Sequence, residues 1–232
     1  MITPSITPTY LISGDFLEFE ELFEKTFPHM IHFKKGDTIF RLTDDRSQYC
    51  YYILRGIATF TLHHESGREK GTTFRGKGSI FPLYYTFEKT TLESYLEVIA
   101  FTEMTVFKID KPSLQKLMTD NPAIALRMCD AWGRYASSLL FITADQVFET
   151  AESRISNFLY ICCNSPELCR NNIIHMTHAE IGMVTGLTRE QISRTLGSLK
   201  KKGIVDMNRG RIQILSKEKL EKCCSYMVSV NP

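Results

Sequence analysis

Between residues 30 and 110, apolar and polar residues alternate in many short runs that glycines interrupt. Runs of this kind are typical of antiparallel strands joined by tight turns. The pattern therefore predicts an antiparallel barrel. Its strands are expected at residues 31–33, 38–40, 48–54, 57–62, 70–74, 79–81 and from 95 to 109. The apolar residues of segment 16–23, just before the barrel, predict a short amphipathic helix.

The hydrophobic spacing becomes helical after Pro112, and Pro122 opens a long helix that we expect to reach at least Thr143. Apolar residues recur in this helix at steps of three or four, which places them on one stripe. The stripe consists of Ile124, Met128, Ala131, Tyr135, Leu139 and Ile142. It can be buried against a second copy of the chain or against the barrel of its own chain. Two further helices are predicted, over residues 149–163 and 216–228.

Two helices separated by a glycine turn are predicted between residues 177 and 202. Thr177 followed by Glu180 is a capping box, and so is Thr188 followed by Gln191. Each capping box marks the start of a helix. Gly186 lies between the helices and supplies the turn, because glycine takes a left-handed backbone conformation without steric cost.

The second of these helices has an apolar face and a polar face. Ile192, Leu196 and Leu199 fall on the first, at positions i, i+4 and i+7. The second carries Arg189, Glu190, Ser193 and Arg194. Side chains of these types near a helix N-terminus can read base edges in the major groove of DNA. The alternative is an ordinary helical hairpin with a solvated charged face.

The segment after this helix is basic. Lys200, Lys201 and Lys202 precede a hairpin-like stretch over residues 207–214, which contains Arg209 and Arg211. A basic β-hairpin after two such helices indicates a wing, whose cations contact DNA phosphates. This combination favours DNA binding over the plain hairpin.

Charge is distributed unevenly along the chain, although the net charge is only +2. Residues 170–232 hold 11 Lys and Arg against 5 Asp and Glu, whereas the remainder holds 17 against 21. A basic C-terminal module beside a mildly acidic larger one is expected of a DNA reader joined to a sensor. No apolar run approaches the roughly 18 residues of a membrane span, and no signal peptide is evident. We therefore expect a cytoplasmic protein without membrane contact.

The seven cysteines show no Cys-x-x-Cys spacing, which favours free thiols over a disulfide framework or a zinc site. The sequence also lacks a nucleophile motif, a phosphate loop and metal-ligand spacing, so we expect neither an enzyme nor a metal protein.

The run from Gly182 to Lys200, GMVTGLTREQISRTLGSLK, resembles the recognition motif of the CRP/FNR transcription regulators. The segments KGDTIF and YYILRG are similar to the β-roll of that family's sensor domain. The resemblance implies an α+β fold in three parts. These are an effector-sensing double-stranded β-helix over residues 1–110, a dimerisation helix over 111–146 and a winged helix-turn-helix over 147–232.

The resemblance also implies a homodimer, and we expect the apolar stripe of the long helix to face the second copy. It further implies that the dimer binds a palindromic operator with TGA-containing half-sites and contacts RNA polymerase, as activators of the family do. In the family, the residues that match Arg194 and Glu190 contact a G·C pair. The remaining DNA-binding residues are expected to be Thr188, Arg189, Ser193, Lys200, Lys201, Arg209 and Arg211.

The effector is not expected to be cAMP, haem or an iron–sulfur cluster. Where the cyclic-nucleotide branch has Gly-Glu and Arg-Ser for the ribose and phosphate, this chain has Pro82-Leu83 and Glu93-Ser94. The cyclic-nucleotide branch also has a pair of polar residues on the long helix, and this chain has Leu139-Leu140 at those positions. A glutamate at the phosphate position repels the anion. The iron–sulfur branch of the family relies on an N-terminal cluster of cysteines, whereas the first cysteine of this chain is Cys50. Residues 78–101 contain no histidine that could ligate a haem iron.

Aromatic residues and a few cations remain around the predicted pocket. The expected effector-binding residues are Tyr84, Tyr85, Tyr95, Trp132, Arg134 and Tyr135, with Arg75 and Lys89 nearby. This lining suits a small aromatic or apolar ligand with one anionic group. It resembles, loosely, the halorespiration regulators of the family. Alternatively, the rings are barrel core and no ligand binds.

Two other functions stay open at this point. One is an effector-independent or thiol-controlled regulator of the same fold. The other is a cyclic-nucleotide-type sensor whose output is not DNA binding.

Overall fold

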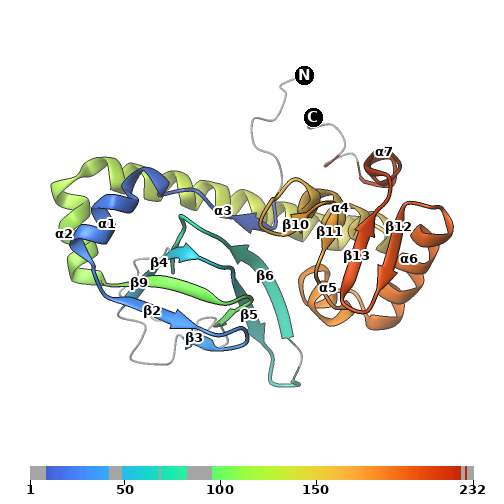
Figure 1. Ribbon diagram of the computed structural model, residues 1–232, viewed down its shortest axis with the longest axis horizontal. Coiled ribbons are helices and arrows are strands. Elements are labelled where there is room, and N and C mark those ends of the chain that lie inside the picture. Colours follow the sequence, from blue (N-terminus) through green and yellow to red (C-terminus); the bar gives the residue numbers. More distant parts are fainter. Residues whose placement is uncertain (1–8, 42–48, 68, 83–95, 226–227, 229–232) are drawn as a thin grey trace. The chain divides into compact units, whose positions relative to one another are not determined.

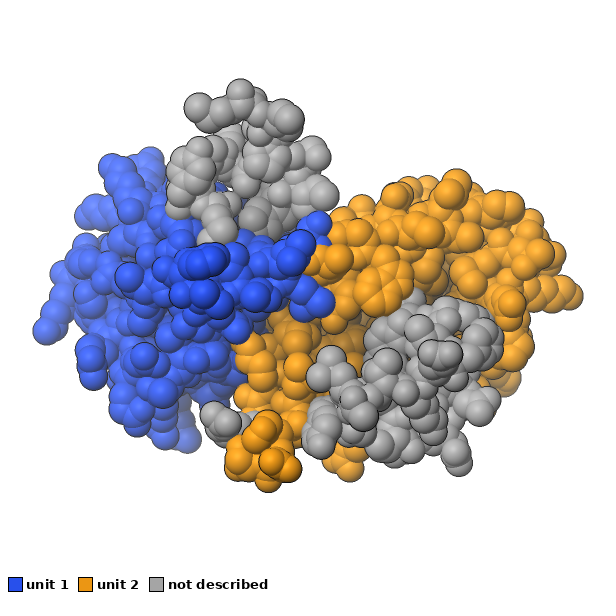
Figure 2. Space-filling view, turned by 180° about the vertical axis from the view of Figure 1, so that it is seen from behind, with its two compact units in different colours: residues 1–10, 137–232 blue, residues 11–136 orange. Residues whose placement is uncertain are grey.

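The computed structural model describes residues 9–41, 49–67, 69–82, 96–225 and 228 (Figure 1). The chain divides into two compact units, which Figure 2 colours separately. One unit comprises residues 11–136, and the other comprises residues 1–10 and 137–232. The boundary lies inside helix α3 (Pro122–Phe148).

Residues 11–136 form a β-roll in which the described strands make two sheets. The first sheet has the order β1-β6-β5-β8-β3 and the second has the order β2-β9-β4-β7. All neighbours pair antiparallel except β1 and β6, which are parallel. The strands are β1 (Leu11–Ile12), β2 (Met30–Phe33), β3 (Thr38–Arg41), β4 (Tyr49–Arg55), β5 (Ala58–His63), β6 (Glu69–Arg75), β7 (Ile80–Phe81), β8 (Leu96–Ala100) and β9 (Met104–Asp110).

The predicted β-roll is therefore confirmed, with one difference in its strands. The stretch from residue 95 to 109 contains two strands, β8 and β9, because the chain turns at Phe101 and Thr102. Their backbone N–H groups both donate to the carbonyl of Ile57, at 2.8 and 3.2 Å. Gly56 lies against this turn with φ at +92°, and a Cβ there would come within 2.2 Å of the Glu103 carbonyl oxygen. The turn thus requires glycine at position 56.

Apolar side chains fill most of the interior of the roll. Residues from both sheets form one buried cluster, which includes Ile39, Phe40, Tyr51, Ile53, Ala58, Phe60, Phe81, Val98 and Val106. A second cluster lies under the helical segments, and it includes Phe16, Phe23, Tyr52, Phe107, Ile109, Leu114, Ile124 and Ala131. These segments are η1 (Leu17–Phe19), α1 (Glu20–Thr26), α2 (Lys111–Asp120) and the first half of α3.

The first half of the apolar stripe predicted on the long helix faces the barrel of its own chain. Ile124 and Ala131 are fully buried in the second cluster, and Met128 and Tyr135 pack against it. Our expectation that these four residues face another copy is therefore wrong. The physical reason is that the second cluster needs a covering element, and α3 supplies it with the same stripe.

The other unit holds the predicted helix-turn-helix and wing. Its described helices besides α3 are α4 (Ala151–Cys163), α5 (His178–Thr185), α6 (Arg189–Lys201) and α7 (Lys217–Glu221). Its described strands are β10 (Cys169–Arg170), β11 (Ile173–Ile174), β12 (Val205–Asn208) and β13 (Arg211–Ile214), in the order β10-β11-β13-β12. Helix α7, the last that the structure describes before residue 226, is shorter than the predicted 216–228. It stops at Glu221, and the N–H of Ser225 donates instead to the Asn157 side chain at 2.9 Å.

Candidate nucleic-acid interface and effector site

The helix-turn-helix is built by the two capping boxes that the sequence predicted. The N–H of Thr177 donates to Glu180 at 2.7 Å, and the N–H of Glu180 donates back to the Thr177 hydroxyl at 3.2 Å. Thr188 and Gln191 repeat this exchange at the start of α6, at 2.9 and 3.3 Å. These bonds satisfy backbone donors that otherwise lack partners, so both helix starts are fixed.

Glycines determine how closely the two helices approach. Gly186 follows α5 with φ at +70°, the left-handed conformation that the turn requires. A Cβ on Gly182 would come within 2.9 Å of the Leu187 carbonyl oxygen and 3.1 Å of the Ile192 side chain. Without that Cβ, α6 packs directly on α5.

Helix α6 turns a polar face to solvent. Ile192, Leu196 and Leu199 are fully buried, as expected, and Thr195 is buried beside them. The predicted base-reading residues are all exposed: Arg189, Glu190, Ser193 and Arg194. The backbone N–H of Glu190 and the Thr188 hydroxyl lower the pKa of the Glu190 carboxyl. At neutral pH this side chain is therefore an ionised acceptor, which is the form that accepts from a cytosine amino group.

The wing is a tight hairpin beside α6. Asn208 pairs with Arg211, which leaves Arg209 and Gly210 as a two-residue turn with Gly210 at φ +68°. Both arginines are exposed. Arg211 donates to the Gln213 side chain at 3.2 Å. The turn therefore presents the Arg209 guanidinium to solvent.

A groove of about 610 Å³ lies between the wing and the N-termini of α5 and α6. Two of the predicted DNA-binding residues, Arg189 and Arg209, line this groove, but no pattern in the sequence predicts the groove itself. The other lining residues are Met176, Thr177, His178, Ala179, Met207, Asn208, Gly210 and Ile212. Helix N-termini and arginines both favour anions, so the groove suits a nucleic-acid phosphate.

The three lysines at the end of α6 differ in their surroundings. Lys200 pairs with Asp206 at 2.6 Å, and Lys202 pairs with Glu152 at 2.5 Å. Lys201 is exposed and has no partner in the part of the chain that the structure describes. Because exposed ion pairs contribute little to stability, Lys200 can exchange Asp206 for a phosphate.

The predicted effector residues are only partly within the described structure. Tyr84, Tyr85 and Tyr95 lie outside the described residues, as do Lys89 and Glu93. Trp132, Arg134 and Tyr135 all lie on α3. The Trp132 and Tyr135 rings contact each other with centroids 5.6 Å apart, and Trp132 is 37% exposed.

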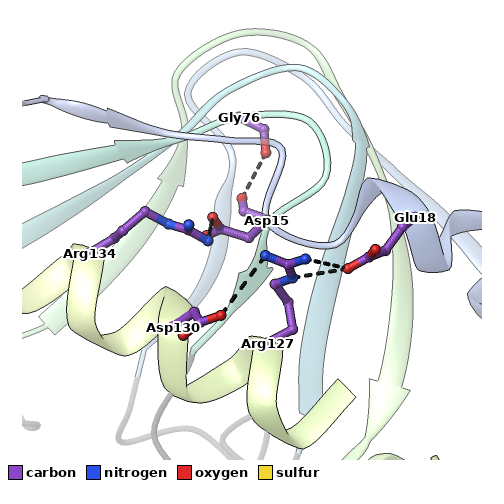
Figure 3. Close-up of polar contacts among 7 residues, drawn as sticks. Asp15, Glu18, Gly76, Arg127, Asp130 and Arg134 are labelled. Atoms are coloured by element: carbon purple, nitrogen blue, oxygen red, sulfur yellow. Dashed lines mark hydrogen bonds and ion pairs between the residues drawn. The ribbon is translucent and has the colours of Figure 1, made fainter. Parts of the chain in front are cut away.

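Arg134 is held by Asp15. Figure 3 shows this ion pair, together with the bond of 2.7 Å from Arg127 to Glu18. Burial raises the pKa of the Asp15 carboxyl, although the Arg134 charge opposes this shift. The two ion pairs fix the first half of α3 against residues 15–18. Tyr135 lies one residue further along, and its ring covers the guanidinium of Arg75, at 4.4 Å from the ring centroid.

Two further residues bear on which effector the roll could bind: His63, whose imidazole is of the type that ligates haem iron, and Leu140. The Nε2 atom of His63 lies 2.7 Å from a Glu97 carboxylate oxygen, so a protein carboxylate engages this imidazole. Leu140, which stands where the cyclic-nucleotide branch has a polar residue, is 73% exposed. Among the described residues, no group of His, Cys, Asp and Glu could hold a metal ion, and no helix could span a membrane.

Comparisons with known families agree with this architecture. The family described as "Cyclic nucleotide-binding domain" matches residues 30–121, and the family described as "Crp-like helix-turn-helix domain" matches residues 153–223. The two matches fall on the β-roll and on the helix-turn-helix with its wing.

Similar proteins are transcription regulators. The chain is 22% identical to a global nitrogen regulator of a Nostoc species, over 84% of this chain and 90% of that protein. It is 25% identical to the cAMP-activated global transcriptional regulator Vfr of Pseudomonas aeruginosa, over 69% and 78%. A CooA mutant from Carboxydothermus hydrogenoformans has the same fold, with a TM-score of 0.70, 22% identity and coverage of 87% and 89%. The chain thus belongs to the CRP/FNR family of DNA-binding transcription regulators.

Proposed function

We propose that this regulator binds a palindromic operator as a homodimer and that a small organic effector other than cAMP controls it. The observation that carries the proposal is the exposed polar face of α6 beside a groove lined by Arg189 and Arg209. On this basis we expect it to act in the cytoplasm, as an activator that contacts RNA polymerase. The division into parts 1–110, 111–146 and 147–232 stays a prediction.

Base readout is assigned to α6. Arg194 donates two hydrogen bonds to guanine O6 and N7, and Glu190 accepts from the amino group of the paired cytosine. They lie four residues apart on the exposed face, so one G·C pair of a TGA core can receive both. Ser193 and Arg189 contact the neighbouring bases. Phosphate contacts are assigned to Thr188, Lys200, Lys201, Arg209 and Arg211, which are all exposed.

Dimerisation is assigned to a stripe of α3 other than the one predicted from the sequence. Exposed residues recur in α3 at alternating steps of three and four, which is the spacing of a coiled-coil seam. This seam consists of Leu126, Cys129, Gly133, Ala136, Leu140, Thr143 and Val147. Its three large aliphatic residues, Leu126, Leu140 and Val147, are about 70% exposed.

The small residues in the middle of the seam favour a second helix as the packing partner. The space beside Gly133 is open, since a Cβ there would meet no atom within 4 Å. A glycine inside a helix costs about 1 kcal/mol relative to alanine, so its presence calls for a reason. Small residues at 133 and 136 let a second backbone approach closely. A second copy of α3 in parallel then gives the two-fold symmetry that a palindromic operator demands.

Control by a small effector is supported by the match of residues 30–121 to a ligand-binding domain. We assign the effector to Trp132, Arg134 and Tyr135 together with Tyr84, Tyr85 and Tyr95. Two of these, Trp132 and Tyr135, form the aromatic pair on α3. Arg134 is included because it is adjacent to Tyr135 on α3, although it also forms an ion pair with Asp15.

One observation favours thiol control as a second candidate. The sulfur atoms of Cys163 and Cys169 are 3.9 Å apart, close enough that a small shift would let them form a disulfide. Burial, however, raises the pKa of Cys163 to about 12, so the reactive thiolate is scarce at neutral pH. For this reason effector control is the function we propose.

The proposal is tested by fluorescence anisotropy on a labelled palindrome with two TGA-containing half-sites one helical turn apart. We expect salt-sensitive binding by two chains per duplex, and weaker binding to a duplex with one scrambled half-site. Equal affinity for the intact and fully scrambled duplexes would remove the sequence-specific part of the proposal. Sedimentation of the free protein as a monomer at binding concentrations would remove the dimer.

A further inference from the structure

Arg75 is a fully buried cation in the interior of the β-roll. It ends β6, it is only 2% exposed, and it pairs in register with Ala58 of β5. Opposed residues of an antiparallel pair point to the same face of a sheet, and Ala58 belongs to the interior apolar cluster. The guanidinium is therefore inside the roll, between the rings of Tyr135 at 4.4 Å and Phe60 at 5.5 Å.

Two of the three nitrogen atoms of this guanidinium lack acceptors. Its Nε and Nη1 atoms are buried and make no hydrogen bond to any residue that the structure describes. The carboxylate that acts on Arg75 is that of Asp15, but Asp15 accepts its hydrogen bond from Arg134 instead. Aromatic faces attract the cation, yet they satisfy none of its in-plane N–H groups.

A buried charge without a hydrogen-bonded partner is costly, and proteins retain one where it has a use. Burial lowers the pKa of Arg75 to about 10, so the side chain is still cationic at neutral pH. Asp15 is the carboxylate that acts on Arg75, and it is already hydrogen-bonded to Arg134. The buried Arg75 guanidinium can therefore receive one further negative charge.

We infer that Arg75 is an anion receptor inside the β-roll and that it binds the carboxylate of a small organic acid with an apolar body. The guanidinium fork matches a carboxylate with two parallel hydrogen bonds. The apolar body is required by the surroundings, because the Phe60 ring lies against Arg75 and in turn contacts Phe81 of the interior cluster, with ring centroids 5.7 Å apart.

This inference deepens the proposed function, since the ligand would be the effector. Tyr135 belongs to α3, and its ring covers the guanidinium that receives the carboxylate. The ligand would thus be held between β6 and α3, so its binding would tighten the contact of α3 with the roll. Arg75 would select an effector that carries a negative charge, which the aromatic residues alone cannot do.

The test is calorimetry and thermal unfolding of the full chain with sodium phenylacetate, benzoate and hexanoate, and with neutral phenylacetamide. We expect at least one carboxylate to bind saturably and to raise the melting temperature, and phenylacetamide to do neither. In Arg75→Met the affinity for that carboxylate should fall about 10- to 100-fold, the effect of losing charge-assisted hydrogen bonds. Arg55→Met, which removes an exposed arginine at the end of β4, is the matched control and should bind as the wild type does.

Arg75→Met also has an outcome that does not depend on the ligand. Methionine replaces an unpaired buried charge by an apolar side chain of similar length, so the ligand-free variant should melt at or above the wild-type temperature. A variant that melts lower would show that Arg75 stabilises the roll as it stands, which overturns the inference. Undiminished carboxylate binding by Arg75→Met would overturn it as well, as would a wild-type response to none of the three carboxylates.

Carboxylate binding and DNA binding are separate properties of the protein and can be measured independently. DNA binding is measured by anisotropy on the same preparations. Carboxylate binding that depends on Arg75 without any DNA binding would overturn the proposed function and leave the anion receptor. Specific DNA binding without carboxylate binding would overturn the anion receptor and leave DNA binding as part of the proposed function.

Discussion

The amide nitrogen of Asn157 donates a hydrogen bond of 2.6 Å to Asp145, and both side chains are almost completely buried. The same amide lies 3.0 Å from the Ser225 hydroxyl, and its oxygen accepts from the Ser225 N–H at 2.9 Å. Tyr10 also donates to Asp145, at 3.3 Å. This network joins the end of α3 to α4 and to the C-terminal segment within one unit.

We predict that Asn157→Ala lowers the free energy of unfolding by about 3 kcal/mol, because it deprives the buried Asp145 carboxylate of a close partner. Urea unfolding followed by circular dichroism measures the change. Asn164→Ala, which removes an exposed bond to Lys217, is the control and should cost less than about 0.5 kcal/mol. Equal losses in the two variants would mean that the network contributes little.

Glu97 is a buried carboxylate of the β-roll that accepts from Thr38 at 2.6 Å and from Arg41 at 3.0 Å. Burial by itself raises the pKa of Glu97, but these bonds and the Arg41 charge outweigh it, so the pKa lies below the ordinary 4.5. A carboxyl with a lowered folded pKa stabilises the fold above its ordinary pKa. That contribution is lost as the pH falls through the folded value.

We therefore predict that Glu97→Gln loses about 1–3 kcal/mol of unfolding free energy at pH 7. It should also lose less stability than the wild type between pH 5 and pH 3, because the charge is already absent. Denaturant unfolding at several pH values measures both effects. Glu65→Gln, at an exposed turn position, should follow the wild-type curve. Parallel curves for Glu97→Gln and the wild type would contradict the assignment.

Much of the fold could be predicted because local signals determine it. The capping boxes at Thr177 and Thr188 satisfy their own backbone donors, so sequence alone locates both helix starts. The strands of the roll follow from alternation and glycine turns. Strand β1 could not be found this way, because it has two residues and pairs with β6, more than 60 residues away.

The sites were less accessible to sequence reasoning. The helical period of α3 identifies an apolar stripe, but it does not say which of two apolar stripes meets the barrel. Met128 was assigned to the dimer although it packs on the chain's own core, whereas Leu126 and Gly133 were not identified. Arg75 appeared only as a nearby cation, since its missing acceptors are a property of the folded interior.

Arg194 is predicted to read a guanine. We expect Arg194→Ala to cost about 1–3 kcal/mol of binding free energy on a TGA-containing palindrome and to flatten the preference at the guanine. The reason is that alanine cannot replace the two hydrogen bonds of the exposed guanidinium. Competition binding on palindromes varied at that base measures both effects. Full discrimination retained by the variant would show that the recognition face is assigned incorrectly.

Lys201 is predicted to contact phosphate and no base. Replacing it with alanine should weaken binding to all sequences similarly and reduce the slope of log affinity against log salt by about one. Titrations on specific and scrambled duplexes at several salt concentrations provide the measurement. Lys202→Ala is the comparison, because Lys202 is paired with Glu152 and should change the slope less. A loss confined to the specific duplex would contradict this role.

Cys129 allows the dimer seam to be tested with a native residue. It is exposed and lies on the seam between Leu126 and Gly133, so two copies in a parallel pair of α3 helices would bring their Cys129 thiols together. Disulfides form when the Cα atoms are within about 7 Å, which seam positions of a coiled coil satisfy. We predict that a mild oxidant such as copper phenanthroline converts the protein to a disulfide-linked dimer and that Cys129→Ser abolishes the product.

The same seam predicts contrasting effects for neighbouring substitutions. Leu126→Asp with Leu140→Asp should yield a folded monomer, because both side chains are exposed in the single chain and lose only contacts between copies. Met128→Asp should instead lower the melting temperature, since Met128 packs against the core cluster of the roll. Sedimentation and thermal unfolding distinguish the two outcomes. A double variant that stays dimeric, together with a Cys129→Ser protein that still crosslinks, would place the dimer contact elsewhere.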